Sequence, residues 1–170
     1  NSRHLNRQQE GLRSVSLRRL VCLYLGDKTA LNPVMQLQTS ECGLACLCMI
    51  ANAHGQHWHL MDLRHKFPQS LKGTNLKQLI DHSLVLGFNA RPVRLELEEL
   101  QQLRMPCILH WDLNHFVVLQ KISGNKITLL DPALGIRVVS HSEVSHHFTG
   151  IALELTLTCE LSFPFPTARL

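Results

Sequence analysis

Cys42 lies where a polar stretch meets a long apolar run, a position that suits a nucleophile. The run Leu44–Ala51 is apolar on all sides, so it predicts a buried helix that ends at Gly55. Ser40 or Glu41 stands where the cap or first-turn acid of that helix is expected. Unpaired N–H groups and the helix dipole favour a thiolate in the first turn, so Cys42 is the candidate nucleophile.

Three other polar residues have the types and the order that a cysteine nucleophile needs. His115 opens one apolar strand-like run and Asp131 closes the next, and the turn at 123–125 predicts that the two runs form a hairpin. The hairpin places the two side chains nearly opposite each other, so Asp131 would accept the Nδ1 proton of His115, the candidate base. Gln36 would donate to the oxyanion together with the backbone N–H of Cys42.

Each of these residues also has an ordinary structural interpretation. A cysteine at a helix start is more often a small core residue, a histidine at a strand start is often a surface residue, and Asp-Pro commonly opens a turn. A tight bend joins Asp112 to the His115 strand, so a partner across the hairpin is better placed to hold the ring. The polar side chains that compete for these roles are Gln38, His110, Asp112 and Asn114.

Histidine clusters raise the alternative of a metal site. They lack the paired cysteines or acids that would make the spacing persuasive, and solvated histidines explain them, so we expect no metal ion. The two clusters are His54, His57 and His59, and His141, His146 and His147.

These motifs, in this order, resemble the peptidase C39 family. The resemblance covers roughly residues 34–155 and rests on Gln36, on Glu41-Cys42-Gly43, on the run Asn114–Val118 and on Asp131-Pro132. The segments Glu-Cys-Gly-Leu-Ala-Cys-Leu and Pro-Cys-Ile-Leu-His-Trp-Asp are most similar to the colicin V processing and secretion subgroup.

The resemblance implies a papain-like cysteine peptidase at the N-terminus of a bacterial ABC transporter. Members of this family cleave leader peptides of bacteriocins and similar peptides after a Gly-Gly pair, while the transporter exports the cargo. The implied partners are a peptide with a Gly-Gly leader and the transmembrane and ATP-binding domains of the same transporter. The implied location is the cytoplasmic face of the bacterial inner membrane. No cofactor is implied in this domain, because ATP is expected only in the nucleotide-binding domain.

Two other functional classes stay open at this point. Some domains with this fold have lost the cysteine and only dock cargo, although Cys42, His115, Asp131 and Gln36 are all present here. An enzyme acting on another acyl bond, such as a transglutaminase or amidase, would share the thioester chemistry.

Composition favours one folded domain. The chain has 170 residues, 45% hydrophobic and 18% charged, and no apolar run long enough to span a membrane. The net charge is +4, and its basic cluster near the N-terminus lacks stacking aromatics, so we expect no nucleic-acid partner. No secretory signal is predicted, and the placement of the six cysteines favours reduced thiols over a disulfide framework.

The chain divides into three predicted parts. Residues 1–30 form a basic lead-in, either a short amphipathic helix or a partly disordered tail, residues 31–157 form the peptidase domain, and residues 158–170 form a tail or linker.

The predicted element order is α+β, with N-terminal helices packed on a C-terminal antiparallel sheet. Helices are predicted at the Cys42 segment, at 58–67, at 76–86 and, short and acidic, at 95–103. Strands are predicted at 88–93, 107–111, 115–121, 126–131, 136–139 and 151–157.

A leader of this class implies an apolar surface groove and a narrow passage at the thiol, which would reject side chains at the cleavage positions. The candidates for that groove are the exposed apolar residues of the helix at 76–86 and the surroundings of Phe88.

Overall fold

The computed structural model describes residues 30–68, 70 and 73–158. The helices are η1 (Thr39–Glu41), α2 (Cys42–Ala53), α3 (Leu60–Lys66), α4 (Leu76–Val85), η2 (Leu97–Gln102) and α5 (His141–His147). The strands are β1 (Phe88–Arg94), β2 (Cys107–Trp111), β3 (His115–Ser123), β4 (Lys126–Asp131), β5 (Gly135–Ser140) and β6 (Phe148–Leu157).

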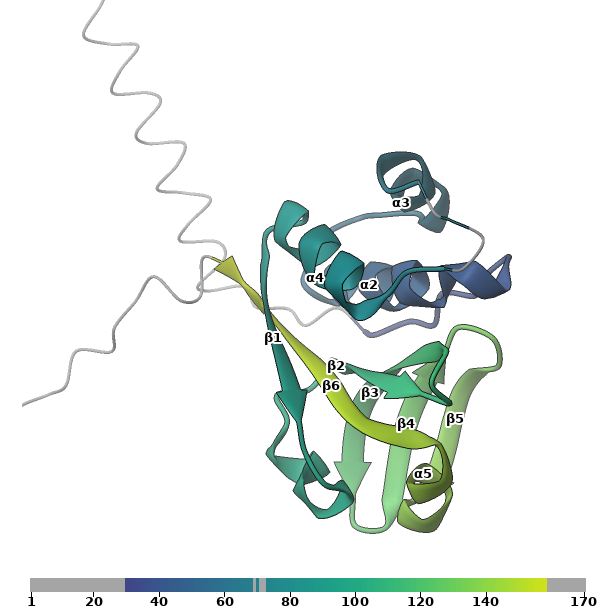
Figure 1. Ribbon diagram of the computed structural model, residues 1–170, viewed down its shortest axis with the longest axis vertical. Coiled ribbons are helices and arrows are strands. Elements are labelled where there is room, and N and C mark those ends of the chain that lie inside the picture. Colours follow the sequence, from purple (N-terminus) through teal and green to yellow (C-terminus); the bar gives the residue numbers. More distant parts are fainter. Residues whose placement is uncertain (1–29, 69, 71–72, 159–170) are drawn as a thin grey trace, which may run out of the picture.

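The strands form one antiparallel sheet in the order β1-β6-β2-β3-β4-β5. Figure 1 shows α2, α3 and α4 gathered together at one end of this curved sheet and α5 near the opposite end. The predicted α+β layout, helices first and antiparallel strands after, is therefore confirmed.

Helix α5 was not predicted, and the acidic helix is shorter than predicted and has 3-10 geometry as η2. Only Val144 is buried in α5, so the sequence carries no apolar period that would reveal a helix. Its start is marked instead by Ser140, whose side chain accepts a hydrogen bond from the Glu143 N–H.

The core explains why α2 lies inside the molecule. All of its residues are buried except Asn52, whose side-chain oxygen accepts a hydrogen bond from the Trp58 N–H at 2.8 Å and whose amide donates to the Trp58 carbonyl at 2.9 Å. The polar side chain at the end of this apolar helix thus holds the loop that follows it.

Both faces of the central strands β2 and β3 are covered, as the alternating residues of β3 show. Phe116 and Val118 of β3 pack in the cluster that contains α2, whereas Val117 and Leu119 pack in a second cluster with residues of η2 and α5. Strands β2 and β3 are therefore apolar on both faces, which accounts for their nearly continuous apolar sequences.

Among the described residues, no helix has the length and apolar character needed to cross a membrane. The lead-in at 1–29 and the tail from 159 lie outside the described residues, so the predicted domain boundaries stay predictions.

We predict that Leu47→Ala destabilises the fold far more than Leu84→Ala does. Leu47 is completely buried in α2, so truncation should lower the free energy of unfolding by about 2–5 kcal/mol. Leu84 on α4 is 53% exposed and serves as the matched control, with an expected loss within about 0.5 kcal/mol. Urea denaturation measures both values, and equal losses would contradict the packing described for α2.

Candidate active site

Cys42 is the first residue of α2 and is 4% exposed. Glu41 occupies the N-cap position, but its side chain makes no capping hydrogen bond to α2, and the Ser40 side chain is not the cap either. The predicted helix start at Cys42 is confirmed, and Glu41 occupies the cap position that was predicted for Ser40 or Glu41, although its side chain does not bond to α2. The first-turn N–H groups and the positive end of the helix dipole therefore lie beside the Cys42 thiol.

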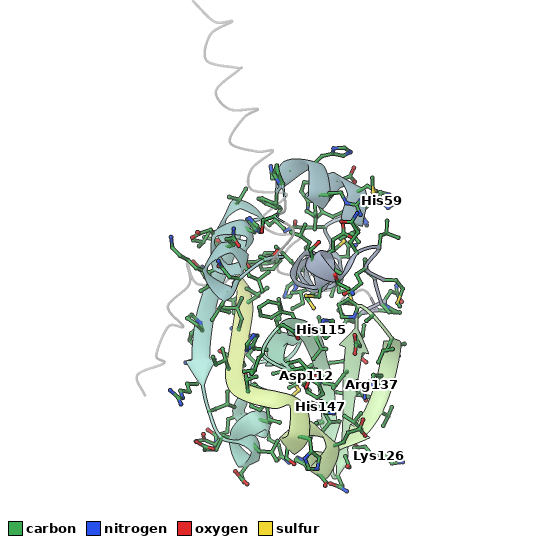
Figure 2. The ribbon with its side chains drawn as sticks, turned by 45° about the vertical axis from the view of Figure 1, so that its right-hand side comes forward. His59, Asp112, His115, Lys126, Arg137 and His147 are labelled. Carbon is green, nitrogen blue, oxygen red and sulfur yellow. The ribbon has the colours of Figure 1, made fainter. Side chains whose placement is uncertain are left out.

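His115 and Asp131 form a hydrogen-bonded pair. His115 begins β3 and Asp131 ends the antiparallel neighbour β4, so both lie at the same end of the sheet. Figure 2 shows His115 between the helices and the strands. The bond runs from His115 Nε2 to Asp131 Oδ1 over 2.9 Å, so the prediction that Asp131 binds the Nδ1 atom is wrong.

The register of the hairpin explains this correction. Val118 pairs with Leu130, so continuing the ladder places Asp131 opposite Val117 and not opposite His115. The turn pairs Ser123 with Lys126, which by simple counting would place Asp131 opposite Val118, and an irregularity between Leu119 and Lys121 then shifts it one residue nearer to His115. The His115 ring reaches Asp131 along a diagonal of the sheet and therefore uses its distal nitrogen.

Asp131 is 3% exposed and has three donors around it. Besides His115, the backbone N–H of Ala133 donates to Oδ1 at 2.9 Å and Arg137 Nη1 donates to Oδ2 at 3.4 Å. The same guanidinium donates to Glu143 Oε1 at 2.7 Å. Arg137 and Glu143 were missed from the sequence, because the pairing of β4 with β5 decides which side chains reach Asp131.

The electrostatics favour a charged pair. Burial by itself lowers the pKa of His115, but hydrogen bonds to Asp131 and then to the Cys42 thiol outweigh it and raise the pKa to about 9. Burial raises the pKa of Asp131, but the hydrogen bonds from His115 and the Ala133 N–H outweigh it, so the pKa lies below its usual value. His115 thus contacts both the Cys42 thiol and a buried carboxylate, as a cysteine nucleophile requires.

Gln36 lies next to the same end of β4. Its backbone N–H donates to the Pro132 carbonyl at 2.9 Å, which ties it to the residue after Asp131. Its side-chain oxygen is buried and has no hydrogen-bond partner among the described residues. The structure thus brings Gln36 to the Asp131 side of the site, while its role as an oxyanion donor stays a prediction.

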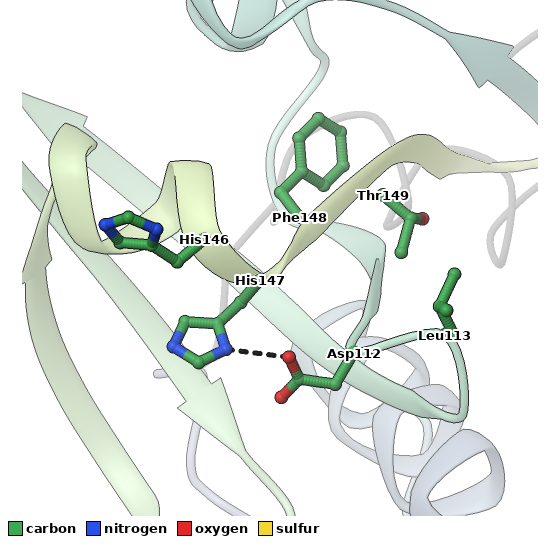
Figure 3. Close-up of a pocket in the computed structure, with 6 residues that line it drawn as sticks. All are labelled: Asp112, Leu113, His146, His147, Phe148 and Thr149. Carbon is green, nitrogen blue, oxygen red and sulfur yellow. Dashed lines mark hydrogen bonds and ion pairs between the residues drawn. The ribbon is translucent and has the colours of Figure 1, made fainter.

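The competing polar residues have other contacts. Asp112 Oδ1 pairs with His147 Nδ1 at 2.7 Å, and Figure 3 shows this pair at a surface pocket of about 420 Å³ that also includes Leu113, His146, Phe148 and Thr149. His110 Nδ1 lies 2.8 Å from Thr149 Oγ1. Gln38 and Asn114 are exposed. Within 30–68, 70 and 73–158, no cluster of three or more metal-ligand side chains forms, the predicted histidine groups included.

The other described thiols have environments that suppress reactivity. Burial, together with the nearby Cys42 and Asp131, raises the pKa of Cys46 well above its usual value. Burial also raises the pKa of Cys48 to about 11 and that of Cys107 to about 12. Cys42 is the thiol that has a histidine beside it.

We predict that iodoacetamide at neutral pH alkylates Cys42 faster than Cys46, Cys48 or Cys107. The thiolate is the nucleophile, and burial raises the pKa of each of the three other thiols above its usual value. Peptide mapping by mass spectrometry at short reaction times gives the rate at each site. Similar rates at all four in the folded protein would contradict an activated Cys42, and the urea-unfolded protein provides the control in which the difference should disappear.

We also predict that His115 makes folding pH-dependent. Because its folded pKa of about 9 lies above the usual 6.5, its stabilisation is complete below pH 6.5 and is lost as the pH rises through 9. The difference in unfolding free energy between the parent and His115→Gln should therefore shrink from pH 6.5 to pH 9.5, with a slope of at most about 1.4 kcal/mol per pH unit. A difference that is constant or grows over this interval would show that the imidazole is not held protonated.

Curated relatives match most of the described part of the chain. The Colicin V secretion/processing ATP-binding protein CvaB of Escherichia coli is 48% identical over 122 residues, covering 72% of this chain and 18% of that protein. The Pediocin PA-1 transport/processing ATP-binding protein PedD of Pediococcus acidilactici is 29% identical and covers 72% of this chain and 18% of its own length. The chain therefore spans less than a fifth of the length of these relatives.

Solved structures show the same fold. A double glycine motif protease from an AMS/PCAT transporter, solved in complex with the leader peptide, superposes with a TM-score of 0.71 at 33% identity, covering 79% of this chain and 96% of that one. The peptidase domain of Streptococcus ComA has a TM-score of 0.69 at 24% identity, covering 75% of this chain and 98% of that one, a likeness of fold alone. The papain-like α+β fold predicted from the sequence is confirmed.

The family model described as Peptidase C39 family matches residues 30–160, which contain Cys42, His115, Asp131 and Gln36. With that match and a relative 48% identical, the chain belongs to the peptidase C39 family of cysteine peptidases.

Proposed function

We propose that this chain is the leader peptidase domain of a bacterial ABC exporter and cleaves its peptide cargo after a Gly-Gly pair. The observation that carries the proposal is the His115–Asp131 pair, which contacts the Cys42 thiol at the start of the buried helix α2. The family membership and the names of the relatives, which couple processing to secretion or transport, support the substrate class.

The proposed reaction proceeds through a thioester. The Cys42 thiolate attacks the carbonyl carbon of the second glycine, and the tetrahedral oxyanion accepts hydrogen bonds from the Gln36 amide and the Cys42 backbone N–H. The His115 imidazolium donates its proton to the leaving amine as the C–N bond breaks. Neutral His115 then takes a proton from water, whose oxygen attacks the thioester, and the leader is released with a free carboxylate as the Cys42 thiolate is restored.

Asp131 has a supporting part in this reaction. Its bond to Nε2 fixes the His115 ring with Nδ1 free to serve the thiol, and its negative charge stabilises the imidazolium. Since Arg137 and the Ala133 N–H hold the carboxylate, the acid stays ionised while the proton moves between His115 and the substrate.

Apolar side chains are exposed in the loops next to the catalytic residues. Leu37 follows Gln36, Leu113 precedes the His115 strand and Leu134 lies in the turn after Asp131, and their exposed fractions are 69%, 80% and 66%. They offer a leader an apolar surface beside the thiol. Leu84 of α4 is exposed as predicted for the groove, whereas Phe88 is completely buried, so the prediction that residues around Phe88 line the groove is wrong at Phe88 itself.

The whole-protein partners follow from the lengths of the relatives. The chain covers 18% of the colicin V protein, which is named an ATP-binding secretion protein, so transmembrane and ATP-binding domains are the proposed partners. A peptidase joined to an ATP-binding exporter would meet its cargo before transport, so the cytoplasmic face of the inner membrane is its proposed location.

We predict that the chain cleaves a synthetic leader ending in Gly-Gly plus a few cargo residues, immediately after the second glycine. Cys42→Ala and His115→Ala should abolish cleavage, since each removes a reacting group, and Asp131→Asn should slow it by at least about tenfold. Gln36→Ala should lower kcat by about 10²–10³-fold with a small change in KM. Mass spectrometry of the products and steady-state kinetics give these values.

The Asp112–His147 pair provides matched controls. Asp112→Asn and His147→Ala alter an acid–histidine pair of the same chemistry that does not contact Cys42, so cleavage should stay close to the parent's rate. Binding of the leader without cleavage by the parent would replace the peptidase with a docking module. Cleavage that survives Cys42→Ala would exclude the thiol mechanism.

A further inference from the structure

Glu41 is a buried acid that the proposed reaction does not use. It directly precedes the nucleophile, is 2% exposed, and its side chain neither caps α2 nor contacts the His115–Asp131 pair. Burying a carboxylate is costly unless each oxygen finds a partner. The partners of the Glu41 carboxylate therefore indicate the role of this buried acid.

Both oxygens of Glu41 are occupied. Oε2 accepts hydrogen bonds from the backbone N–H groups of Leu37 and Gln38, each at 3.0 Å, and Oε1 pairs with Arg64 Nη2 of α3. The two N–H groups belong to the residues immediately after Gln36. The carboxylate thus fixes the backbone of the segment that carries the proposed oxyanion donor.

The same segment is held from its other side. The Gln36 N–H donates to the Pro132 carbonyl at 2.9 Å, so the backbone of residues 36–38 is clamped between Glu41 and the end of β4. The Gln36 side-chain oxygen has no hydrogen-bond partner among the described residues. The position of its side-chain amide therefore depends on the backbone that carries it. A displacement of about 1 Å in a catalytic group lowers the reaction rate on the order of 10²-fold.

We propose that Glu41, held by Arg64, is a positioning residue that sets the Gln36 amide for the oxyanion. This inference rests on the proposed function, because it assigns Glu41 a part in the same acyl transfer. The geometry distinguishes it from a charge effect on the thiol, since the carboxylate points to the segment after Gln36 and its charge is paired with Arg64.

A double-mutant cycle tests the proposal with the Gly-Gly leader peptide as substrate. Glu41→Gln keeps the size of the side chain and one oxygen for the Leu37 and Gln38 N–H groups, but it replaces Oε1 with an NH2 group that faces Arg64, so the ion pair that holds the side chain is lost. It should lower kcat by about 10–100-fold with KM within about twofold, because the lost interaction acts in the transition state. In a Gln36→Ala background the same change should lower kcat by less than about twofold, because the group it positions is absent.

Two further readouts separate positioning from other roles. The rate of Cys42 alkylation by iodoacetamide should be the same in the Glu41→Gln/Arg64→Met double variant and the parent, because removing both partners leaves no unpaired charge beside the thiol. Arg64→Met, which leaves Glu41 in place, should reproduce the fall in kcat and should not add to Glu41→Gln. Arg91→Met is the matched control, since it breaks the Arg91–Glu154 pair, 2.8 Å long and on the opposite edge of the sheet from β5, and should leave kcat unchanged.

An equal fold-loss of kcat in the parent and Gln36→Ala backgrounds, or a changed alkylation rate, overturns the positioning role. If Glu41→Gln does not fold, the Arg64→Met and Gln36→Ala cycle decides by the same criterion. If the parent cleaves no Gly-Gly peptide, the proposed function itself is wrong. If the parent cleaves the peptide but the kcat losses of Glu41→Gln and Gln36→Ala are additive, only the proposed role of Glu41 is wrong.

Discussion

A carboxylate that is 3% exposed has lost nearly all of its hydration, and Asp131 is stable as an anion because protein donors replace the water. These donors come from different parts of the chain: His115 from β3, the Ala133 N–H from the turn after β4, and Arg137 from β5. The anion is therefore compatible only with the native register of three strands. Glu143 extends the requirement to α5, since it binds the other side of the Arg137 guanidinium.

This constraint links the sheet to the chemistry at the helix. The hydrogen bond to this anion raises the pKa of His115 to about 9, so the ring beside the Cys42 thiol is held as an imidazolium. The helix α2 contributes its first-turn N–H groups, and its buried apolar residues fix the position of Cys42 relative to the strands. Neither layer is competent alone, because the base and its orienting acid come from the sheet, and the nucleophile from α2. Burial raises the pKa of Cys46, one turn further along the same helix, so that side chain stays a neutral thiol.

The sequence revealed the types and order of the candidate site residues, and little of what surrounds them. Cys42 was recognisable because an apolar run follows a polar segment. His115 and Asp131 were recognisable because one opens and the other closes two apolar runs that are joined by a turn. The ring nitrogen was predicted wrongly because Asp131 lies diagonally from His115 and not opposite it, and this offset depends on which residues of the turn pair and on a register shift in β3. Arg137 was missed because its partners are set by strand pairing, and Glu41 was assigned to a helix cap although its carboxylate binds the preceding loop.

Two sets of ion pairs support the residues of the site. In one, Glu143 of α5 binds Arg137, which binds Asp131, the partner of His115; in the other, Arg64 of α3 binds Glu41, which binds the segment after Gln36. Neither α3 nor α5 supplies a reacting group, yet each contributes one charged side chain to these ion pairs. An acid directly before a thiolate would disfavour that thiolate by like charge, so pairing Glu41 with an arginine removes an electrostatic cost as well as fixing a loop. The helices α3 and α5 therefore affect this site by fixing the positions of buried acids. This is why loss of Arg64, which is not a reacting group, should lower kcat.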